Sequence, residues 1–305
     1  MKTLPALALL LLLSACGRES EFDLAVDAFE AGNYDTALAG FTALAQRGDA
    51  KSQNNLGIMY EWGLGVDQNH REAAAWYARA AEQGLASSQI RLAQLYIKGL
   101  GVQRDYLEAM KWSRLAAVQG NAEAEANIAY MFHDGIGVKQ DYAEAIKWYR
   151  KSAEKGWISA MHDLGVIYQN GRGVERDYAQ AIAWYRKAAR TGYAYSQDNL
   201  INLYRKGLGV PEDDVKAFEW YLKAARDGHV AEQFMLGVAY LAGQGTPQDS
   251  IRAYAWFDVA ASGGLKNARP FRDKTGAGLN TADLEKARRL ARDLGEKYSN
   301  RENDD

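Results

Sequence analysis

The chain has 305 residues, of which 37 are Lys or Arg and 39 are Asp or Glu, so its formal net charge at pH 7 is −2. Hydrophobic residues make up 48% and charged residues 25%, the composition of a globular protein rather than of a disordered or fibrous one. The balanced charge lacks the basic excess that non-specific nucleic-acid binding requires. The single cysteine excludes an intramolecular disulfide and any metal site built from several cysteines.

The first residues have the form of a secretory signal peptide. Lys2 supplies a positive start, and residues 4–13 form an apolar stretch too short to span a bilayer. Residues 13–16, Leu-Ser-Ala-Cys, resemble the lipobox of bacterial lipoproteins, in which the cysteine is acylated and becomes the mature N-terminus. An ordinary signal peptide with a chance cysteine is the alternative. The lipobox interpretation is favoured because Cys16, the only cysteine of the chain, falls at the one position that the motif needs.

The lipobox resemblance implies an address. Fatty-acyl chains such as palmitate on Cys16 would hold the protein on a membrane surface without spanning it. Gly17 rather than Asp follows the cysteine, and by resemblance to the enterobacterial sorting rule this favours the outer membrane, facing the periplasm. We therefore expect a signal peptide over residues 1–15 and a polar tether over residues 16–21.

Residues 22–49 are expected to form an N-terminal cap. Phe29, Gly32, Tyr34, Ala37 and Phe41 give this segment the look of a shorter unit, closer to half of a tetratricopeptide repeat. Solenoids need such atypical end units, because their terminal repeats have no neighbour on one side.

Several residue types then recur every 36 residues between positions 50 and 264, without insertion or deletion. A leucine or isoleucine keeps this step from Leu56, an aromatic residue from Tyr60, and a Gly-x-Gly pair from Gly63 and Gly65. Six in-phase copies cannot plausibly arise by chance, so the segment is predicted to be a repeat array. The tryptophans that share the period are Trp76, Trp112, Trp148, Trp184, Trp220 and Trp256.

Each copy is predicted to fold as two helices. Gln53, Leu56, Gly57 and Tyr60 follow the i, i+3, i+4, i+7 spacing of one helix face, and we name this segment of each copy the A helix. Residues 73–84 repeat that spacing and form the B helix. The Gly-x-Gly pair between them is expected to end the A helix, because glycine takes the left-handed conformation without strain. Capping-box pairs that mark the start of the B helix are Asp105 with Glu108, Asp141 with Glu144, and Asp177 with Gln180.

This organisation resembles the Sel-1-like repeat, a relative of the tetratricopeptide repeat. The match rests on the pattern A-x5-L-G-x2-Y-x2-G-x-G-V-x2-D-x3-A-x2-W-Y-x2-A-A-x2-G, which residues 50–84 carry almost complete, with Asn69 at the Asp position. The resemblance covers residues 50–264 and implies an all-α fold, a right-handed α-solenoid of stacked helix pairs. In such a stack the tryptophans are expected to lie in the core shared by neighbouring repeats.

The C-terminal residues are expected to close the stack. Residues 265–297 should form capping helices, in which Pro270 disturbs the first, and Leu284, Ala287 and Ala291 line one face of the last. Residues 298–305 are expected to form a disordered tail.

Motifs for chemistry are not found. The histidines at 70, 133, 162 and 229 fall at unrelated phases of the repeat, outside any His-Glu-x-x-His motif, and are expected to be polar surface. His133 and His162 each precede an aspartate, but neighbouring residues on a helix do not face each other. The Gly-x-Gly pairs follow helices rather than strands, so they are not nucleotide fingerprints. We therefore expect no catalytic residue, no metal and no cofactor.

The candidate binding surface is the side of the A helices that faces away from the core. By resemblance to tetratricopeptide arrays, these helices line a concave groove. Its residues differ from copy to copy while the core positions do not, which fits a lining selected for a partner, although unconstrained surface positions would also vary. The candidate groove residues are Asn54, Ile58, Glu61, Ile90, Gln94, Ile97, Tyr130, His133, His162, Gln169, Asp198, Asn202, Arg205 and Phe234.

The sequence thus favours a non-enzymatic, lipid-anchored scaffold that binds a protein or peptide at the cell envelope, expected to be a monomer. The Sel-1-like resemblance implies adaptor roles in complex assembly, signalling or envelope maintenance. The alternative is an enzyme, because a cysteine-rich branch of this family is associated with penicillin binding and β-lactam hydrolysis. That branch ties each helix pair with a disulfide, which the single Cys16 cannot supply.

Overall fold

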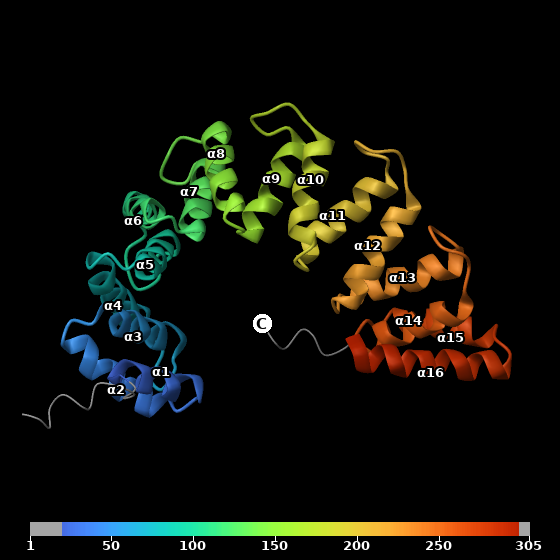
Figure 1. Ribbon diagram of the computed structural model, residues 1–305, viewed down its shortest axis with the longest axis horizontal. Helices are drawn as coiled ribbons and strands as arrows, with labels where there is room; N and C mark the ends of the chain where they lie inside the picture. Colours follow the sequence, from blue (N-terminus) through green and yellow to red (C-terminus); the bar gives the residue numbers. More distant parts are fainter. Residues whose placement is uncertain (1–19, 299–305) are drawn as a thin grey trace, which may run out of the picture. The chain divides into compact units, whose positions relative to one another are not determined.

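The protein is described by a computed structural model over residues 20–298, and in this range every regular element is an α-helix (Figure 1). The chain divides into two compact units, residues 1–140 and 141–305. The predicted signal peptide, Cys16 and the start of the predicted tether lie outside the described residues. Among residues 20–298 no helix is long and apolar enough to cross a membrane.

The first unit contains seven helices within its described residues, 20–140. Each helix packs against the next one along the chain, from α1 with α2 to α6 with α7 (Figure 1). The expected N-terminal cap is a complete helix pair, α1 and α2, and its core around Phe41 continues to Leu56 of α3. The helices are α1 (Glu21–Glu30), α2 (Tyr34–Gln46), α3 (Ala50–Trp62), α4 (His70–Glu82), α5 (Ala86–Lys98), α6 (Tyr106–Val118) and α7 (Ala122–Asp134).

The second unit contains nine helices within its described residues, 141–298. Successive helices again pack in chain order from α8 to α14, after which α15 and α16 both pack against α14. The helices are α8 (Tyr142–Glu154), α9 (Ile158–Asn170), α10 (Tyr178–Ala189), α11 (Ala194–Arg205), α12 (Asp214–Arg226), α13 (Val230–Ala242), α14 (Ser250–Ser262), α15 (Ala268–Ala277) and α16 (Thr281–Tyr298). This sequential packing of helix pairs is that of an all-α repeat solenoid.

The predicted helix starts are confirmed at the B helices. The side chain of Asp105 accepts hydrogen bonds from the backbone N–H groups of Leu107 and Glu108, at 2.9 and 3.1 Å. Asp141 and Asp177 cap α8 and α10 in the same way. These bonds satisfy N–H groups that have no partner within the first helical turn.

The second glycine of each Gly-x-Gly pair holds neighbouring repeats together. At Gly101 a Cβ atom would lie 2.1 Å from the carbonyl oxygen of His70, and at Gly173 it would lie 2.2 Å from Cβ of Tyr142. These contacts are with the first residue of the preceding B helix. A glycine is therefore required for close approach between repeats as well as for the positive φ of about 70°.

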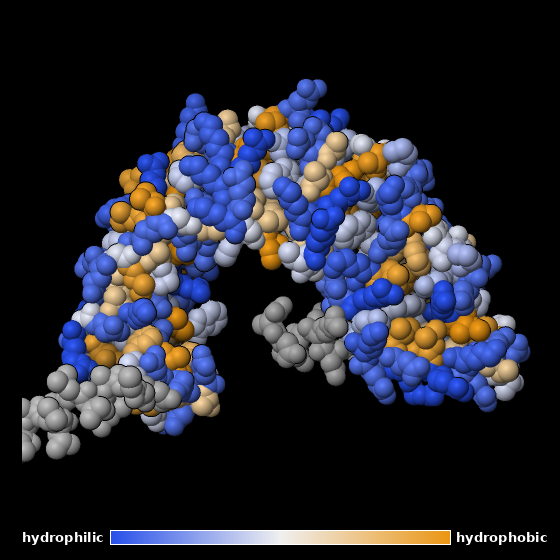
Figure 2. Space-filling view, viewed as in Figure 1, coloured by the Kyte–Doolittle hydropathy of each residue, from blue (hydrophilic) through white to orange (hydrophobic). Residues whose placement is uncertain are grey.

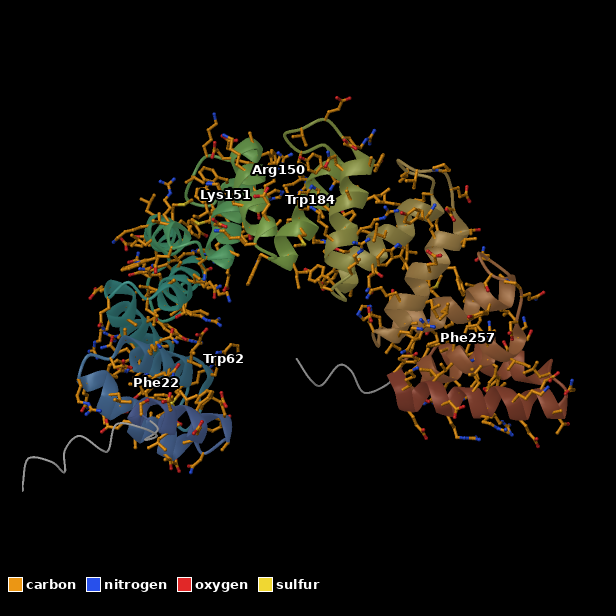
Figure 3. All side chains as sticks on the ribbon, viewed as in Figure 1. Phe22, Trp62, Arg150, Lys151, Trp184 and Phe257 are labelled. Atoms are coloured by element: carbon orange, nitrogen blue, oxygen red, sulfur yellow. The ribbon has the colours of Figure 1, made fainter. Side chains whose placement is uncertain are left out.

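The repeat tryptophans are less buried than expected. Trp112 and Trp256 are buried, but Trp148 and Trp184 are half-buried, and the ammonium group of a lysine covers each of these two rings. Lys187 Nζ lies 3.9 Å from the centroid of the Trp184 ring. The fully buried aromatic of the B helix is the residue that follows, such as Tyr185 after Trp184. Trp148 and Trp184, the latter labelled in Figure 3, thus lie at the edge of the core, whereas Trp112 and Trp256 lie within it.

Glycines on the A helix make room for this buried aromatic. A Cβ atom on Gly57 would lie 2.5 Å from the Tyr77 ring, and one on Gly165 would meet Tyr185 at the same distance. Phe257, labelled in Figure 3, faces Gly237 in the same way.

The C-terminal helices close the second unit. Pro270 lies in the first turn of α15, where its missing N–H group breaks no helical hydrogen bond. The expected face of α16 is confirmed at Ala287 and Ala291, which are buried, while its outer side is hydrophilic (Figure 2). Tyr298, which we expected in a disordered tail, instead ends α16 and stacks on Trp256 with 6.1 Å between ring centroids.

Candidate partner-binding surface

The fourteen candidate groove residues do not form one class of environment. Ile90 is fully buried, so its prediction as a groove residue is wrong; three residues, Tyr130, Asn202 and Arg205, are exposed. The others are half-buried: Asn54, Ile58, Glu61, Gln94, Ile97, His133, His162, Gln169, Asp198 and Phe234.

Candidate residues at equivalent positions of successive repeats are called a row. In the row that contains Glu61, Gln169 and Arg205, these side chains form hydrogen bonds with the buried tyrosine of the B helix in the same repeat. The Tyr77 hydroxyl donates to Glu61 at 2.7 Å, and the Tyr185 hydroxyl donates to Gln169 at 3.0 Å. The guanidinium of Arg205 in turn donates to the hydroxyl of Tyr221, at 3.4 Å.

The row is apolar where the B helix offers no such phenol. Ile97 lies in the repeat that has Ser113 at the tyrosine position, and Leu241 lies in the repeat that has Phe257. A buried hydroxyl without a partner is costly, so the A helix supplies a polar group where a tyrosine needs one. Variation along this row therefore reflects the fold, and is not evidence for a partner.

A second row pairs with the residue 34 positions later, on the next A helix. Asn54 accepts a hydrogen bond from the Ser88 hydroxyl at 2.8 Å, and His162 Nδ1 lies 2.9 Å from the Ser196 hydroxyl. Where this row is apolar its partner is apolar too, as for Phe234, which packs against Ala268. Phe234 also contacts the rings of Phe257 and Phe271, 5.4 and 5.0 Å away between centroids.

The same register places Asp198 beside Glu232. Burial, followed by a hydrogen bond between the two carboxyl groups and the negative charge of Asp198, raises the pKa of Glu232 to about 7. Arg205 and Tyr221 belong to the same neighbourhood, and burial, the largest influence, raises the pKa of the Tyr221 hydroxyl. Like-charged neighbours in a partly dry site hold a proton to a higher pH than an isolated carboxyl group does.

The third row, which contains Ile58, Gln94, Tyr130 and Asn202, includes two of the three exposed candidate residues. Gln94 donates to Glu123 of α7 at 2.8 Å, and Ile58 is half-buried. Tyr130 is 44% exposed, and Asn202 is exposed as well. Burial and a hydrogen bond with Asp134 raise the pKa of the Tyr130 hydroxyl.

The most prominent exposed feature of the second unit is an aromatic cluster around His162. The His162 ring centroid lies 5.5 Å from that of Tyr185, 5.3 Å from that of Tyr193 and 6.2 Å from that of Tyr195. Tyr195 is 68% exposed, and Tyr193 is half-buried. Burial lowers the pKa of His162, so the ring is neutral at pH 7. His162 is therefore part of a packed aromatic group, rather than the isolated polar residue that we expected.

Tyr193 and Tyr195 are not among the candidate groove residues, because they lie at the turn before α11 and in its first turn. The three rows of candidate residues, which contain Asn54, Ile58 and Glu61, all lie further along the A helix. A signal was present, however. The positions equivalent to Tyr195 in the other repeats are small or polar: Lys51, Ser87, Glu123, Ser159 and Ala231.

Two polar pairs involve a histidine. His133 Nδ1 bonds to the Asp134 carboxylate, contrary to the expectation that these neighbours do not interact; Asp134 ends α7, and its side chain turns back to the ring. Ser196, the partner of His162, is fully buried and offers no hydroxyl to a substrate. Among residues 20–298 no group of three His, Cys, Asp or Glu side chains is placed to hold a metal ion.

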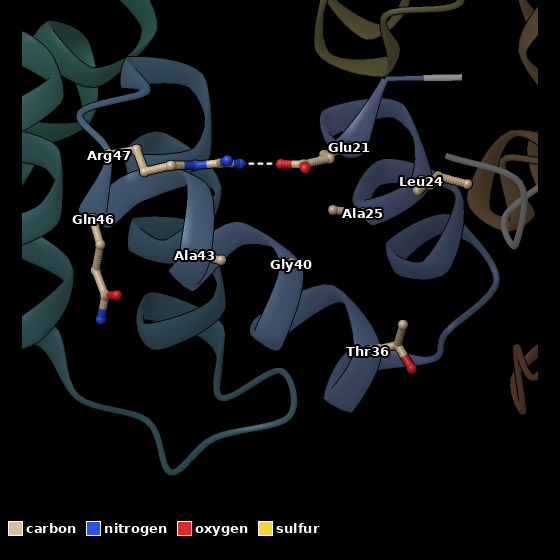
Figure 4. A pocket seen from close by; sticks show the side chains of 8 residues that line it. All are labelled: Glu21, Leu24, Ala25, Thr36, Gly40, Ala43, Gln46 and Arg47. Atoms are coloured by element: carbon tan, nitrogen blue, oxygen red, sulfur yellow. Dashed lines mark hydrogen bonds and ion pairs between the residues drawn. The ribbon is translucent and has the colours of Figure 1, made fainter. Parts of the chain in front are cut away.

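A pocket of about 550 Å³ lies at the N-terminal helix pair, between α1 and α2 (Figure 4). Leu24 is exposed at its edge, and an ion pair joins Glu21 to Arg47 across it. The helices approach closely at its floor, where a Cβ atom on Gly40 would lie 2.8 Å from Cβ of Ala25. The pocket presents no cluster of titratable groups beyond this exposed ion pair.

Comparison with known proteins decides the family. The Sel1 repeat profile matches residues 50–85, 86–121, 122–157, 158–193, 194–229 and 233–265. The chain belongs to the Sel1 repeat family. Each of these Sel1 repeats contains one A helix and one B helix, from α3 and α4 to α13 and α14.

Solved Sel1 structures resemble the chain over most of its length. A Sel1 repeat protein from Oxalobacter formigenes is 33% identical, with a TM-score of 0.65, and the match covers 80% of this chain and 97% of that one. The protein c5321, a protective antigen of uropathogenic Escherichia coli with the same kind of fold, is 31% identical, with a TM-score of 0.51 over 92% of this chain and 68% of that one. No curated protein matches the chain.

Membership in the Sel1 family assigns a general role. Sel1 repeats form a scaffold for protein interaction, and they are typically non-catalytic. The chain is therefore a Sel1 repeat protein with the fold of a protein-interaction scaffold.

Proposed function

We propose that this Sel1 protein is a lipid-anchored, monomeric adaptor of a bacterial cell envelope that binds a protein or peptide segment on the outward side of its A helices. The proposal assigns it no catalytic activity. Its place is the periplasmic side of the outer membrane, where acyl chains on Cys16 hold it.

The aromatic cluster of His162, Tyr193 and Tyr195 carries the binding part of this proposal. Exposed tyrosines are enriched at protein interfaces, because their rings bury a large area at small entropic cost while their hydroxyl groups remain able to form hydrogen bonds. The packing of Tyr195 against His162 and Tyr193, at 6.2 and 5.7 Å between centroids, holds the ring in place before a partner arrives. Such preorganisation lowers the cost of binding.

The A helices of the first unit offer exposed positions of their own, which we include in the proposal as a separate surface. Tyr130 is available on α7, and Trp62 at the end of α3 is 63% exposed (Figure 3). Residues that pair within the fold, such as Glu61 and Asn54, are assigned to stability rather than to binding.

The binding surface is tested by truncating its tyrosines. In a pull-down from envelope extract, Tyr195→Ala and Tyr130→Ala should each weaken capture of the partner proteins while leaving the thermal midpoint nearly unchanged. The matched control is Leu107→Ala, which truncates an equally exposed side chain on the B helix α6 and should capture as wild type does. Unchanged capture by both tyrosine variants would contradict the assignment.

The anchor is tested separately. Cys16→Ala removes the acceptor of the acyl chains, so the protein should leave the membrane fraction after cell disruption. Its persistence there would show that another feature holds it to the membrane. Turnover of the β-lactam nitrocefin by the purified protein would favour the enzymatic alternative.

A further inference from the structure

A second surface of the second unit combines cations with aromatic side chains. A groove of about 320 Å³ lies between the B helices α10 and α12, with Tyr204 of α11 between them. Its cationic lining is Arg186 from α10, Arg190 directly after the end of α10, and Lys216 and Lys223 from α12. Trp220 supplies an apolar wall, and Glu219 is the one acidic residue in the lining.

The two lysines of this groove are partly neutralised. Lys216 pairs with Asp213 at 2.6 Å, and Lys223 pairs with Asp227 at 2.7 Å. The two arginines differ, because within residues 20–298 neither of them forms an ion pair with a carboxylate. Arg186 instead donates a hydrogen bond to the hydroxyl of Tyr204, and Arg190 is exposed.

Repeat symmetry shows that this arginine pair is specific to one groove. At the equivalent position one repeat earlier, Arg150 bonds to Tyr168 as Arg186 bonds to Tyr204, but Glu154 stands in the register of Arg190. Around Tyr96 in the first unit, the same two registers hold Ala78 and Glu82. Around Tyr240 they hold Leu222 and Arg226. Two arginines in these registers occur only at α10.

We propose that the α10–α12 groove binds an acidic peptide segment, with two of its carboxylates on Arg186 and Arg190 and an apolar side chain on Trp220. This site lies on the B helices and goes beyond the A-helix surface of the proposed function.

The spacing of the arginines fits such a segment. Arg190 caps the C-terminus of α10 with a helical backbone conformation, and residues four apart on a helix lie on one face with their Cβ atoms about 5–6 Å apart. Alternate side chains of an extended peptide point the same way and are spaced about 7 Å apart. Arginine also pairs with a carboxylate through two parallel hydrogen bonds, which favours a bound anion over a diffuse counterion.

The groove favours a peptide over a densely charged polymer. Glu219 and the paired aspartates Asp213 and Asp227 would repel a continuous run of phosphates. The Trp220 wall offers an apolar contact that a polymer of phosphates cannot use. The volume of about 320 Å³ accommodates several side chains rather than one small anion.

Fluorescence anisotropy with a fluorescein-labelled hexaglutamate peptide tests the site directly. Every arm uses the full chain carrying Cys16→Ser, so that no acyl group is present. The double variant Arg186→Gln/Arg190→Gln should weaken binding at least about tenfold, as loss of close charge pairs at an interface does. The matched control Arg150→Gln/Lys187→Gln removes the same charge one repeat earlier, at Arg150, and outside the groove lining, at Lys187, and should change the affinity less than about twofold.

Repeat symmetry also allows the site to be duplicated. Glu154→Arg completes the arginine pair beside Arg150, Tyr168 and Trp184, so the number of peptides bound per chain should rise from one to two. This gain does not depend on a variant that might fail through misfolding, and a helical circular-dichroism spectrum equal to that of wild type checks each protein.

Three results would overturn the proposal. The first is equal weakening by the two double variants, which would indicate attraction by net charge alone. The second is absence of hexaglutamate binding to the wild-type chain. The third is displacement of the peptide by stoichiometric inorganic phosphate, which would indicate a small-anion site.

Discussion

The Tyr77 hydroxyl donates a hydrogen bond to the Glu61 carboxylate, joining the B helix α4 to the A helix α3 of one repeat at 2.7 Å. Burial and this bond raise the pKa of the Tyr77 hydroxyl far above its ordinary value. The last Sel1 repeat replaces the pair by Leu241 and Phe257, which removes both polar groups together. The residue at the position of Glu61 therefore changes from repeat to repeat together with the buried residue at the position of Tyr77.

A double-mutant cycle measures this tie. Glu61→Leu leaves the buried Tyr77 hydroxyl without its acceptor and should cost about 1–3 kcal/mol of unfolding free energy. Tyr77→Phe should cost about 1 kcal/mol, because Glu61 is half-buried and water can reach it. The double variant reproduces the Leu241–Phe257 pair, so urea denaturation should give a smaller loss than the sum of the two single losses. Additive losses would show that the two side chains are independent.

The unequal burial of the B-helix aromatics leads to a second prediction. Tyr185→Ala removes a fully buried ring and should cost about 3–5 kcal/mol. Trp184→Ala should cost less, because that ring is half-buried and its contact with Lys187 is solvent-exposed. The two denaturation midpoints, measured under one set of conditions, check the order. An equal or greater loss of stability for Trp184→Ala would show that Trp184 contributes to the core as much as Tyr185 does.

Glu232 should make the protein less stable as the pH rises. Its pKa is raised from 4.5 to about 7 in the folded chain, so between these values the unfolded state loses a proton that the folded state keeps. The unfolding free energy should therefore fall from pH 4.5 to pH 7. Arg205 and Tyr221 lie near the Asp198–Glu232 pair, and the charges of Arg205, Glu232 and Asp198 all act on the Tyr221 hydroxyl.

Replacing the titrating carboxyl isolates that contribution. Urea denaturation of Glu232→Gln should show a smaller fall in stability over this pH range than wild type. Glu219→Gln, which removes an exposed carboxyl from α12, serves as the control and should follow the wild-type profile. An identical fall in Glu232→Gln and wild type would contradict the raised pKa of Glu232.

His162 should act in the opposite direction. Burial lowers its pKa below the ordinary 6.5, so at mildly acidic pH the unfolded state binds a proton that the folded state does not. Stability should therefore be lost as the pH falls below 6.5. The titratable groups nearby are Asp163 and the tyrosines Tyr185, Tyr193 and Tyr195. His162→Gln can still bond to Ser196 and should lose less stability than wild type between neutral and mildly acidic pH in thermal unfolding. A loss equal to that of wild type would show that the ring is not desolvated.

The sequence was sufficient for the repeat, because a fixed period exposes every position that the stack needs. Leu56 and Gly63 could be placed in a helix and at its end from spacing alone, and the structure has them there. The depth of the tryptophans could not be predicted. Trp184 and Tyr185 are adjacent and equally periodic, and only the angle of the helix against its neighbours decides which ring is buried.

The candidate surface was harder for a related reason. The variation of Glu61, Gln169 and Arg205 along the repeats suggested selection by a binding partner. Each of these residues instead forms a hydrogen bond with the tyrosine 16 positions later in the same chain. The exposed Tyr195 was not predicted, because it does not lie at any of the candidate groove positions. Positions whose side chains bond to another helix of the same or the next repeat must be set aside first. Only variation at the remaining positions can indicate a binding surface.

Site-specific photocrosslinking tests the proposed adaptor role most directly. Benzoylphenylalanine replaces Tyr195 in cells, the intact envelope is irradiated, and adducts are identified by mass spectrometry. We predict a discrete protein adduct at position 195 that is absent when the same photoreactive residue replaces the exposed Lys111 on α6. No adduct at position 195, or the same adducts from both positions, would contradict a partner-binding surface on the A helices.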